Sequence, residues 1–441
     1  MKNLDIFLYE WMHFVRSPFK IVALFLFILS AIYGLHNGAN LYHKQKAEIE
    51  KINQKVAEQQ QKILAYYEKG EKGPKDRPWI DVTTPFWATW NVSTYAFKKP
   101  SQEIVYSIGQ AEQYGFYKQI SVWASPYDAD MAEEISNPER LQSGTLDFSF
   151  IVLYLLPLLL LILLYNIKGA EAEQGFLPLI VVQTGSKNTW LLARIAFYGM
   201  LSMVVLVGLM LYGAMLTGVL SVENSVFVKI LLLLFLYLIF WISIFFFILK
   251  KGKSSVINTL QMVGFWLIFA FIIPATVHQW VSIEKPANLM TDFIDVTRDG
   301  QEKLFSQPDS VQLKQLIALF PEIRKSPFIK DSIKTKEALS FSASGLASTM
   351  MKEATAPIKE QSEAKNTLIQ QTYWFNPITF FQNQLNALAQ TQYNDYENYR
   401  TDIQTLIDKC IKIMVLDIWN DVKVDKQKYL EYCRHFKHNK P

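Results

Sequence analysis

Long runs of apolar residues alternate with polar segments along the chain. The hydrocarbon core of a membrane is roughly 30 Å thick, so a helix needs about 20 mostly apolar residues to cross it. Four runs come close to this length, and a fifth, which comes first, is shorter. In chain order the predicted membrane helices are 21–35, 148–165, 195–220, 227–249 and 256–281. The pattern therefore predicts a mainly α polytopic membrane protein.

The residues before the first apolar run have an amphipathic pattern. Between positions 4 and 15, apolar and aromatic side chains recur at helical spacing among charged ones. A helix of this kind lies in the membrane interface. A cleaved signal peptide is the competing interpretation, but the charged, tryptophan-containing stretch is long and no small-residue cleavage site follows it. We therefore expect residues 1–20 to stay on the chain as an interfacial helix.

Lysine and arginine are unevenly distributed among the predicted connections. They precede the first span and recur between the second and third and between the fourth and fifth, as Arg16, Lys20, Lys168, Lys187, Arg194, Lys250, Lys251 and Lys253. The short loop 221–225, on the opposite side, carries Glu223 and no cation. Cations concentrate on the cytoplasmic side of a membrane. This predicts a cytoplasmic N-terminus, a cytoplasmic loop over 166–194, and extracytoplasmic domains over 36–147 and 282–441.

The first of these two large domains begins with a helix that continues out of the membrane. Its apolar residues have heptad spacing, at Ile49, Ile52, Val56, Ile63 and Tyr66. The helix either packs on its own domain or forms a coiled coil with a partner. An aromatic-rich stretch follows, at 84–97, and we expect it to form domain core in preference to a ligand-contacting or subunit-contacting surface. The second domain has apolar residues at helical spacing and is expected to be mostly helical.

Composition narrows the function classes. The net charge of +4 is small for 441 residues and no dense basic stripe is present, which argues against a nucleic-acid partner. Two cysteines, Cys410 and Cys433, are too few for a disulfide scaffold. Cys433, His435 and His438 have soft ligand atoms at close spacing, but we interpret them as part of a basic tail and expect no metal site.

Catalytic and ion-coupling chemistry is missing from the apolar runs. Lys229 and His278 lie near the outer ends of their spans, and no chain of ionisable groups lies at membrane depth. No P-loop, no H-E-x-x-H and no G-x-S-x-G motif occurs. Pro157 and Pro274 are expected to kink their helices. A transporter without an ion relay or a nucleotide site takes its energy from a separate subunit, so we expect this chain not to be an enzyme.

The segment 137–194 resembles permeases of the ABC-2 exporter class, especially those associated with multicopper-enzyme maturation. The resemblance rests on three groups of residues. Gly144, Leu146, Asp147 and Phe148 are similar to the start of the second span, Leu156 and Pro157 to its proline, and Glu171, Glu173, Gly175 and Leu177 to the E-x-E-x-G-T-L element that follows. Phe176 stands where the family usually has threonine.

Two weaker similarities extend the resemblance over most of the chain. The N-terminal residues Glu10, Arg16 and Ser17 are similar to the family's cytoplasmic elbow helix. Residues 376–389, followed by Tyr399 and Arg400, are similar to an external helical block of its large-domain members. Such permeases usually end in a sixth span, and the chain shows no further apolar run after position 281.

The resemblance implies a function and a set of partners. The chain would be the permease of an ABC exporter in the bacterial cytoplasmic membrane, in contact with lipid and with a second permease, the same or related. ATP and Mg²⁺ would bind in a cytoplasmic ATPase. The resemblance assigns contact with that ATPase to Glu171, Glu173, Gly175 and Leu177 of a coupling helix and to Glu10 and Arg16 of the elbow. The alternative is a membrane scaffold or sensor that transports nothing.

Overall fold

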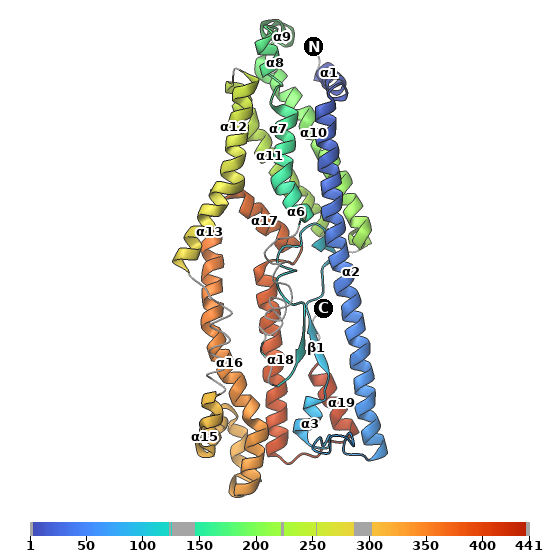
Figure 1. The fold of residues 1–441 in the computed structure, drawn as a ribbon, viewed down its shortest axis with the longest axis vertical. Coiled ribbons are helices and arrows are strands. Elements are labelled where there is room, and N and C mark those ends of the chain that lie inside the picture. Colours follow the sequence, from blue (N-terminus) through green and yellow to red (C-terminus); the bar gives the residue numbers. More distant parts are fainter. Residues whose placement is uncertain are drawn as a thin grey trace.

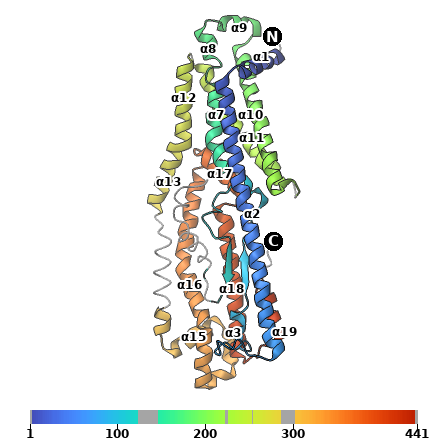
Figure 2. The same ribbon diagram turned by 45° about the vertical axis from the view of Figure 1, so that its right-hand side comes forward.

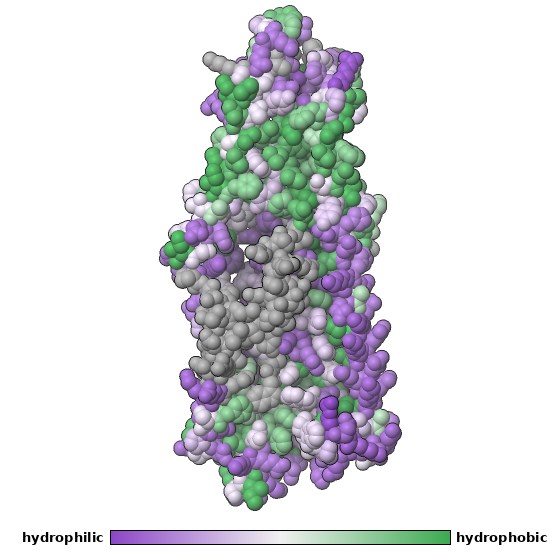
Figure 3. Space-filling model, viewed as in Figure 1, coloured by the Kyte–Doolittle hydropathy of each residue, from purple (hydrophilic) through white to green (hydrophobic). Residues whose placement is uncertain are grey.

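The computed structural model of the chain is elongated and mainly helical, with an apolar half and a polar half (Figure 1). It describes residues 3–122, 125, 146–221, 225–252, 254–285 and 302–437. On the face that Figure 3 shows, hydrophobic side chains form a broad band across one half of the molecule, whereas hydrophilic side chains predominate on the coloured part of the other half. The band is the surface expected where lipid tails replace water.

Helices make up the apolar half. They are α1 (Asn3–Val15), the first part of α2 (Pro18–Lys69), α6 (Phe148–Phe150), the π-helical η2 (Ile151–Leu155), α7 (Leu156–Leu164), α8 (Gly169–Glu173), α9 (Leu177–Thr184), α10 (Lys187–Thr217), η3 (Val219–Ser221), α11 (Ser225–Lys251), α12 (Ser255–Leu267), the π-helical η4 (Ile268–Ile272) and α13 (Ile273–Glu284).

The polar half contains the end of α2 and elements from two distant parts of the sequence. From the first part come α3 (Pro85–Trp90), β1 (Thr94–Phe97), η1 (Gln102–Val105) and β2 (Tyr117–Ile120). From the second come α15 (Asp309–Leu319), η5 (Pro321–Lys325), η6 (Pro327–Lys330), α16 (Ser332–Gln371), α17 (Pro377–Leu388), α18 (Tyr393–Trp419) and α19 (Lys426–His435). The strands β1 and β2 pair antiparallel. The predicted helical character of the second part is confirmed.

Four helices are long and apolar enough to cross a membrane, and they lie at Pro18–Lys69, Lys187–Thr217, Ser225–Lys251 and Ser255–Glu284. A shorter apolar helix covers Phe148–Leu164. The second predicted run thus forms the shorter helix, although the first run, 21–35, is the shorter stretch of apolar sequence. That run lies inside a helix that begins at Pro18 and continues without a break, whereas the second run ends at Leu164, just before the turn that leads to α8.

The predicted continuation of the first membrane helix is confirmed by the 52 residues of α2, which runs through both halves (Figures 1 and 2). Two of its heptad residues, Ile52 and Ile63, are buried. Ile63 lies in one apolar core with Val82 and Ala88, which follow it in the sequence. The outer part of α2 thus packs on its own domain, which is the first of the two predicted alternatives.

The aromatic-rich stretch contributes to a domain core as predicted, through Ala88, Val92 and Ala96, and Phe86 packs against that core. The aromatic rings themselves are less deeply buried, and Trp90 is 49% exposed. Along β1 burial alternates, with Tyr95 and Phe97 on the less buried side. The prediction weighed aromatic content alone, but in a strand successive side chains point to opposite faces. Ala96 occupies the more buried face of β1, and the rings of Tyr95 and Phe97 lie on its half-buried face.

Candidate functional site

The short helix α8 lies at the end of the apolar half that is farthest from the polar half (Figures 1 and 2). It contains two of the predicted coupling residues, Glu171 and Glu173. The N-terminal helix α1 lies across the same end of the molecule and does not continue the direction of α2 (Figure 2). The elbow and the coupling element, about 160 residues apart in the sequence, are therefore neighbours in space.

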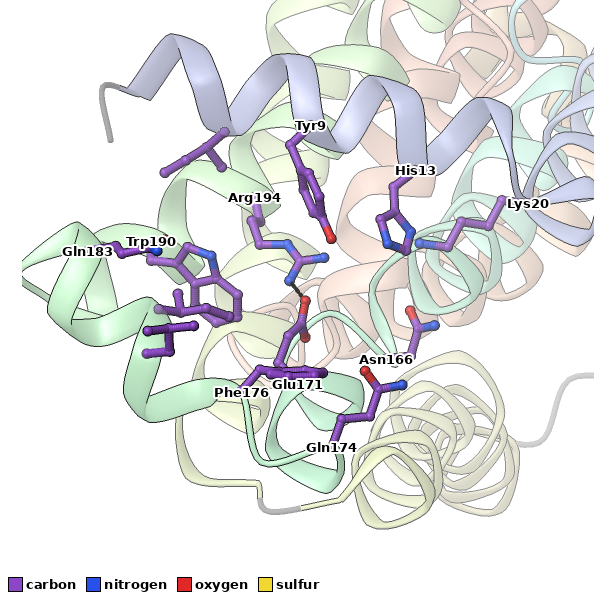
Figure 4. Close-up of a pocket in the computed structure, with 13 residues that line it drawn as sticks. Tyr9, His13, Lys20, Asn166, Glu171, Gln174, Phe176, Gln183, Trp190 and Arg194 are labelled. Carbon is purple, nitrogen blue, oxygen red and sulfur yellow. Dashed lines mark hydrogen bonds and ion pairs between the residues drawn. The ribbon is translucent and has the colours of Figure 1, made fainter.

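One guanidinium group joins three helices at this end. Arg194 of α10 forms ion pairs with Glu10 of α1 and with Glu171 of α8 (the second is drawn in Figure 4). Its Nη1 also donates a hydrogen bond of 2.6 Å to the carbonyl oxygen of Ile167. The side chains of Arg194, Glu10 and Glu171 are 5%, 0% and 14% exposed. Buried charges persist when they are paired, because a lone buried charge is costly.

A second buried cation lies beside this cluster. Lys20 Nζ donates to the carbonyl oxygen of Leu163 at 2.9 Å and to the hydroxyl of Tyr198 at 3.0 Å. The indole of Trp190 lies 4.9 Å from the Arg194 guanidinium, a distance suited to a cation–π contact.

The opposite side of α8 is attached to the turn between α11 and α12. The buried Lys168 ammonium donates to three carbonyl oxygens at the end of α11, those of Leu249 (2.8 Å), Lys250 (2.9 Å) and Gly252 (2.5 Å). A cation is favourable there, since the last carbonyls of a helix have no partners within it. Glu173 accepts a hydrogen bond of 2.7 Å from the backbone N–H of Ser255, at the start of α12. A Cβ on Gly169 would lie 2.6 Å from that same nitrogen.

A cavity of about 480 Å³ opens between α1, α9 and α10. Figure 4 shows its charged and polar wall, with Glu171 and Arg194 in contact, Lys20 beside His13, and His13 and Tyr9 approaching from α1. Apolar residues of α9 form another wall. Two α9 side chains are exposed despite being apolar, Leu179 at 59% and Val182 at 82%. Exposed apolar groups beside a cavity are typical of a surface that contacts another molecule.

The other predicted coupling residues have simpler positions. Gly175 ends α8 in a left-handed conformation, with φ of 76°, which glycine adopts without steric cost. Leu177 begins α9 and is half-buried, and Phe176, the departure from the family pattern, lines the cavity. Arg16 is exposed between α1 and α2 and lies outside the ion-pair cluster. The structure thus brings together Glu10 and Glu171 and places Glu173 on the far side of α8.

Sequence reasoning missed the basic residues at the centre of this site. Arg194, Lys20 and Lys168 served there only to orient the chain, and 166–194 was predicted to be a cytoplasmic coupling loop or helix. The helix that contains the third predicted span, 195–220, begins earlier than the span, because α10 begins at Lys187 and Arg194 lies two turns into it. Ser186 caps that helix by accepting from the N–H of Thr189. A serine cap eight residues before an arginine was the signal that could have placed Arg194 inside a helix, where it needs a partner.

The C-terminal tail contributes little to a site in the part of the chain that is described. Cys433 is half-buried, and His435 Nε2 lies 3.4 Å from Glu431 Oε1. His438 falls outside the described residues, as do Glu223 and Lys253 of the orientation argument. Within the described ranges, no group of three or more His, Cys, Asp or Glu side chains is placed to hold a metal ion.

Comparison with known proteins gives one match. A family model described as "Domain of unknown function (DUF3526)" matches residues 296–438, which cover most of the second helical segment and less than half of the chain. No curated protein matches the chain. No solved structure matches it either. The match describes a family without an assigned function, so function is argued from the site.

Proposed function

We propose that this chain is the permease subunit of an ATP-driven exporter of the ABC-2 class, in the bacterial cytoplasmic membrane. The end that contains α1, α8 and α9 would face the cytoplasm and bind an ABC ATPase, which holds ATP and Mg²⁺. A second permease, the same chain or a related one, would complete the membrane half. This proposal rests on the resemblance of the coupling element together with the geometry around it.

The observation that carries the proposal is the set of attachments of α8. Glu171 links it through Arg194 to α10 and α1, while Lys168 and Glu173 link it to the ends of α11 and α12. A push on α8 and α9 therefore reaches four other helices at once through fixed polar contacts. A scaffold that only anchors a partner has no need of such connections. Transport driven from outside the chain requires them, since movement must pass from the ATPase into the membrane helices.

The geometry also changes how the two carboxylates would act. Glu171 and Glu173 have partners inside the chain, so they would transmit movement from α9 instead of contacting the ATPase themselves. The contact surface would be the exposed apolar side of α9. Leu179 and Val182 would pack against the ATPase, because burying a large aliphatic side chain contributes about 1.5–3 kcal/mol.

The test is a charge placed on α9. Val182→Asp should leave folding unchanged, because the side chain is 82% exposed, and should abolish co-purification of an ATPase with the tagged chain. Ile333→Asp is the matched control, since Ile333 is an aliphatic residue that is 79% exposed at the start of α16. It should retain the ATPase. If the wild-type chain in native membranes binds no ATPase under conditions of ATP excess, the scaffold or sensor alternative replaces this proposal.

A further inference from the structure

Two apolar helices of this chain are interrupted in the same way. The π-helical segment η2 ends at Leu155 and is followed by Pro157, and η4 ends at Ile272 and is followed by Pro274. The two prolines were expected to kink their helices. Figure 1 shows that α12 and α13, which flank η4, run in different directions. In both helices the break therefore consists of one wide turn and a proline two residues after it.

A proline leaves the carbonyl four residues before it without its helical partner. For Pro157 that carbonyl belongs to Leu153, and it accepts a hydrogen bond from the hydroxyl of Tyr237 on α11. The next carbonyl, of Tyr154, accepts a bond of 3.1 Å from the indole of Trp266 on α12. No straightening of the helix can replace the first bond, because Pro157 has no N–H. Residues of other helices therefore hold the bend.

The two breaks face each other. The ring of Tyr154, in η2, lies 6.0 Å from that of Phe271, in η4. Phe271 in turn lies 5.2 Å from the ring of Trp266, whose indole binds the first break. A change of angle at one break moves the side chains that support the other. The two interruptions therefore form one mechanical unit, centred on this aromatic group.

A helix from the polar half also reaches this unit. α17 lies where the two halves meet, below α7 and α12 in Figure 1. Its Ile378, Phe381 and Leu385 belong to the same buried core as the apolar helices. The ring of Phe381 lies 4.9 Å from that of Tyr237, and Gln382 Nε2 donates to Ser149 Oγ, just before η2, at 3.2 Å. α17 thus contacts the residue whose hydroxyl supports the first break.

We propose that the two proline breaks are a paired hinge and that α17 sets its angle, so that the polar half and the bend of the membrane helices change together. The physical basis is the shared residue Tyr237. Its hydroxyl satisfies a carbonyl that the helix cannot satisfy, and its ring packs on α17. Displacement of α17 moves that hydroxyl away from the carbonyl of Leu153. The helix must then bend differently for that carbonyl to find another hydrogen-bond donor. The hinge is a property of this chain alone and does not depend on an ATPase.

The experiment measures the bend directly in the full chain in lipid nanodiscs. Spin labels are placed at Met200 on α10 and Val256 on α12, which are 60% and 68% exposed, after Cys410 and Cys433 are replaced by alanine. Double electron–electron resonance then gives the distance distribution between α10 and α12. Tyr237→Phe removes only the hydroxyl. It should raise the population of a second distance roughly tenfold, the effect of losing one bond to a buried carbonyl worth about 1.4 kcal/mol.

The chain provides a matched control. Tyr106 is also fully buried and donates its hydroxyl, at 2.8 Å, to a carbonyl of a membrane helix, that of Met210 in α10. Met210 already has a helical partner, the N–H of Ala214, because no proline follows. Tyr106→Phe should therefore leave the distances unchanged. A Tyr237→Phe distribution that matches the control would overturn the hinge.

The role of α17 is tested separately. Phe381→Leu keeps an apolar side chain but removes the ring contact with Tyr237, and it should populate the same second distance as Tyr237→Phe. Gln384→Ala, on the same helix, is its control and should match the wild-type chain. If Tyr237→Phe changes the distances and Phe381→Leu does not, the paired hinge is retained, but the proposal that α17 sets its angle is wrong.

Discussion

The two ends of the apolar half are held together by different interactions. At the end that contains α8, long charged side chains join the helices: Arg194 binds two carboxylates, and Lys168 binds three carbonyls. At the end next to the polar half, the helices touch through glycine. A Cβ on Gly34 would lie 2.7 Å from the backbone nitrogen of Phe148, and one on Gly38 would lie 2.7 Å from Val105 Cα.

One carboxylate occupies the close-packed end, and its surroundings differ from those of Glu10 and Glu171. Asp147 caps α6 by accepting from the N–H of Phe150 at 2.8 Å, and it also accepts from the N–H of Ile108 at 2.9 Å. No cation binds it among the described contacts, and burial raises the pKa of its carboxyl. This end uses the aspartate as a hydrogen-bond acceptor, whereas the α8 end uses its carboxylates as charges.

The difference follows from the size of the elements that meet. α8 has five residues and cannot bury enough apolar surface to fix its own position, so a few strong, directional contacts hold it. α2 and α10 are long and are held by close packing along their length. A junction held by ion pairs should be destabilised by a change of charge and should tolerate a change of side-chain volume. A junction held by close packing should be destabilised by added volume and should tolerate a change of charge. Three substitutions test this contrast, and each is compared with a control in the same chain.

The largest effect is expected for Arg194→Met. This change leaves Glu10 and Glu171 buried without a cation, which costs about 3–5 kcal/mol of unfolding free energy. Unfolding in mixed micelles, followed by tryptophan fluorescence during titration with SDS, measures the loss.

The control replaces all three charges together, as Glu10→Gln, Glu171→Gln and Arg194→Met. Because the triple variant leaves no carboxylate buried without its cation, and Lys20 keeps its bonds to the Leu163 carbonyl and the Tyr198 hydroxyl, it should recover most of the stability lost in the single variant. A triple variant as unstable as Arg194→Met would mean that shape, and not charge, holds the α8 end together. The contrast between the two ends would then be wrong.

The second effect concerns volume at the opposite end. Gly38→Ala adds one methyl group against the backbone of η1 and should cost about 1–3 kcal/mol, because backbone cannot move aside as a flexible side chain can. Gly208→Ala, inside α10, meets nothing within 4 Å and should be neutral or stabilising by up to about 1 kcal/mol. The same SDS titration compares them. Equal stability of the two variants would show that α2 and η1 are not in close contact.

Much of the fold could be predicted because it follows from patterns of neighbouring residues. Apolar runs placed the membrane helices, and heptad spacing predicted the long outer part of α2. The amphipathic stretch at 4–15 predicted α1. The boundaries were less certain where a helix begins beyond the apolar run, as α10 does at Lys187, because membrane helices extend into water with polar residues at their ends.

The site was predicted only in part, since its central contacts join residues far apart in the sequence. Family resemblance indicated Glu10 and Glu171, but nothing in the sequence pairs either of them with Arg194, which is 184 and 23 positions away. The aromatic stretch at 84–97 does contribute to a core, but the sequence did not indicate which of its side chains are the deeply buried ones. Which face of a short strand is buried depends on what packs against it, and here those partners come from the other end of the chain, such as Tyr399, whose hydroxyl binds the carbonyl of Ala96.

The smallest effect is expected at Glu173, and it separates two roles for this residue. Glu173 is exposed, and its one described bond is to the N–H of Ser255. Glu173→Ala removes that bond and should cost about 1 kcal/mol. Glu173→Gln keeps an oxygen at the same place and should cost less than half of that. SDS titration measures both, with Arg194→Met as the reference for a large loss.

The glutamine variant decides whether the charge of Glu173 has a further purpose. If Glu173 contacts an ATPase through its charge, Glu173→Gln should fold like the wild-type chain and still lose stimulated ATP hydrolysis. The structure leads us to expect the opposite, because the oxygen already accepts from the N–H of Ser255 at the start of α12, and under the proposed function it would transmit movement through that hydrogen bond, which glutamine retains. We therefore expect Glu173→Gln to keep at least about half of the wild-type stimulation, and Glu173→Ala to lose more, since a neutral acceptor preserves most of such a bond. Equal loss in both variants would show that the charge itself is needed and would restore direct contact with the ATPase as the role of Glu173.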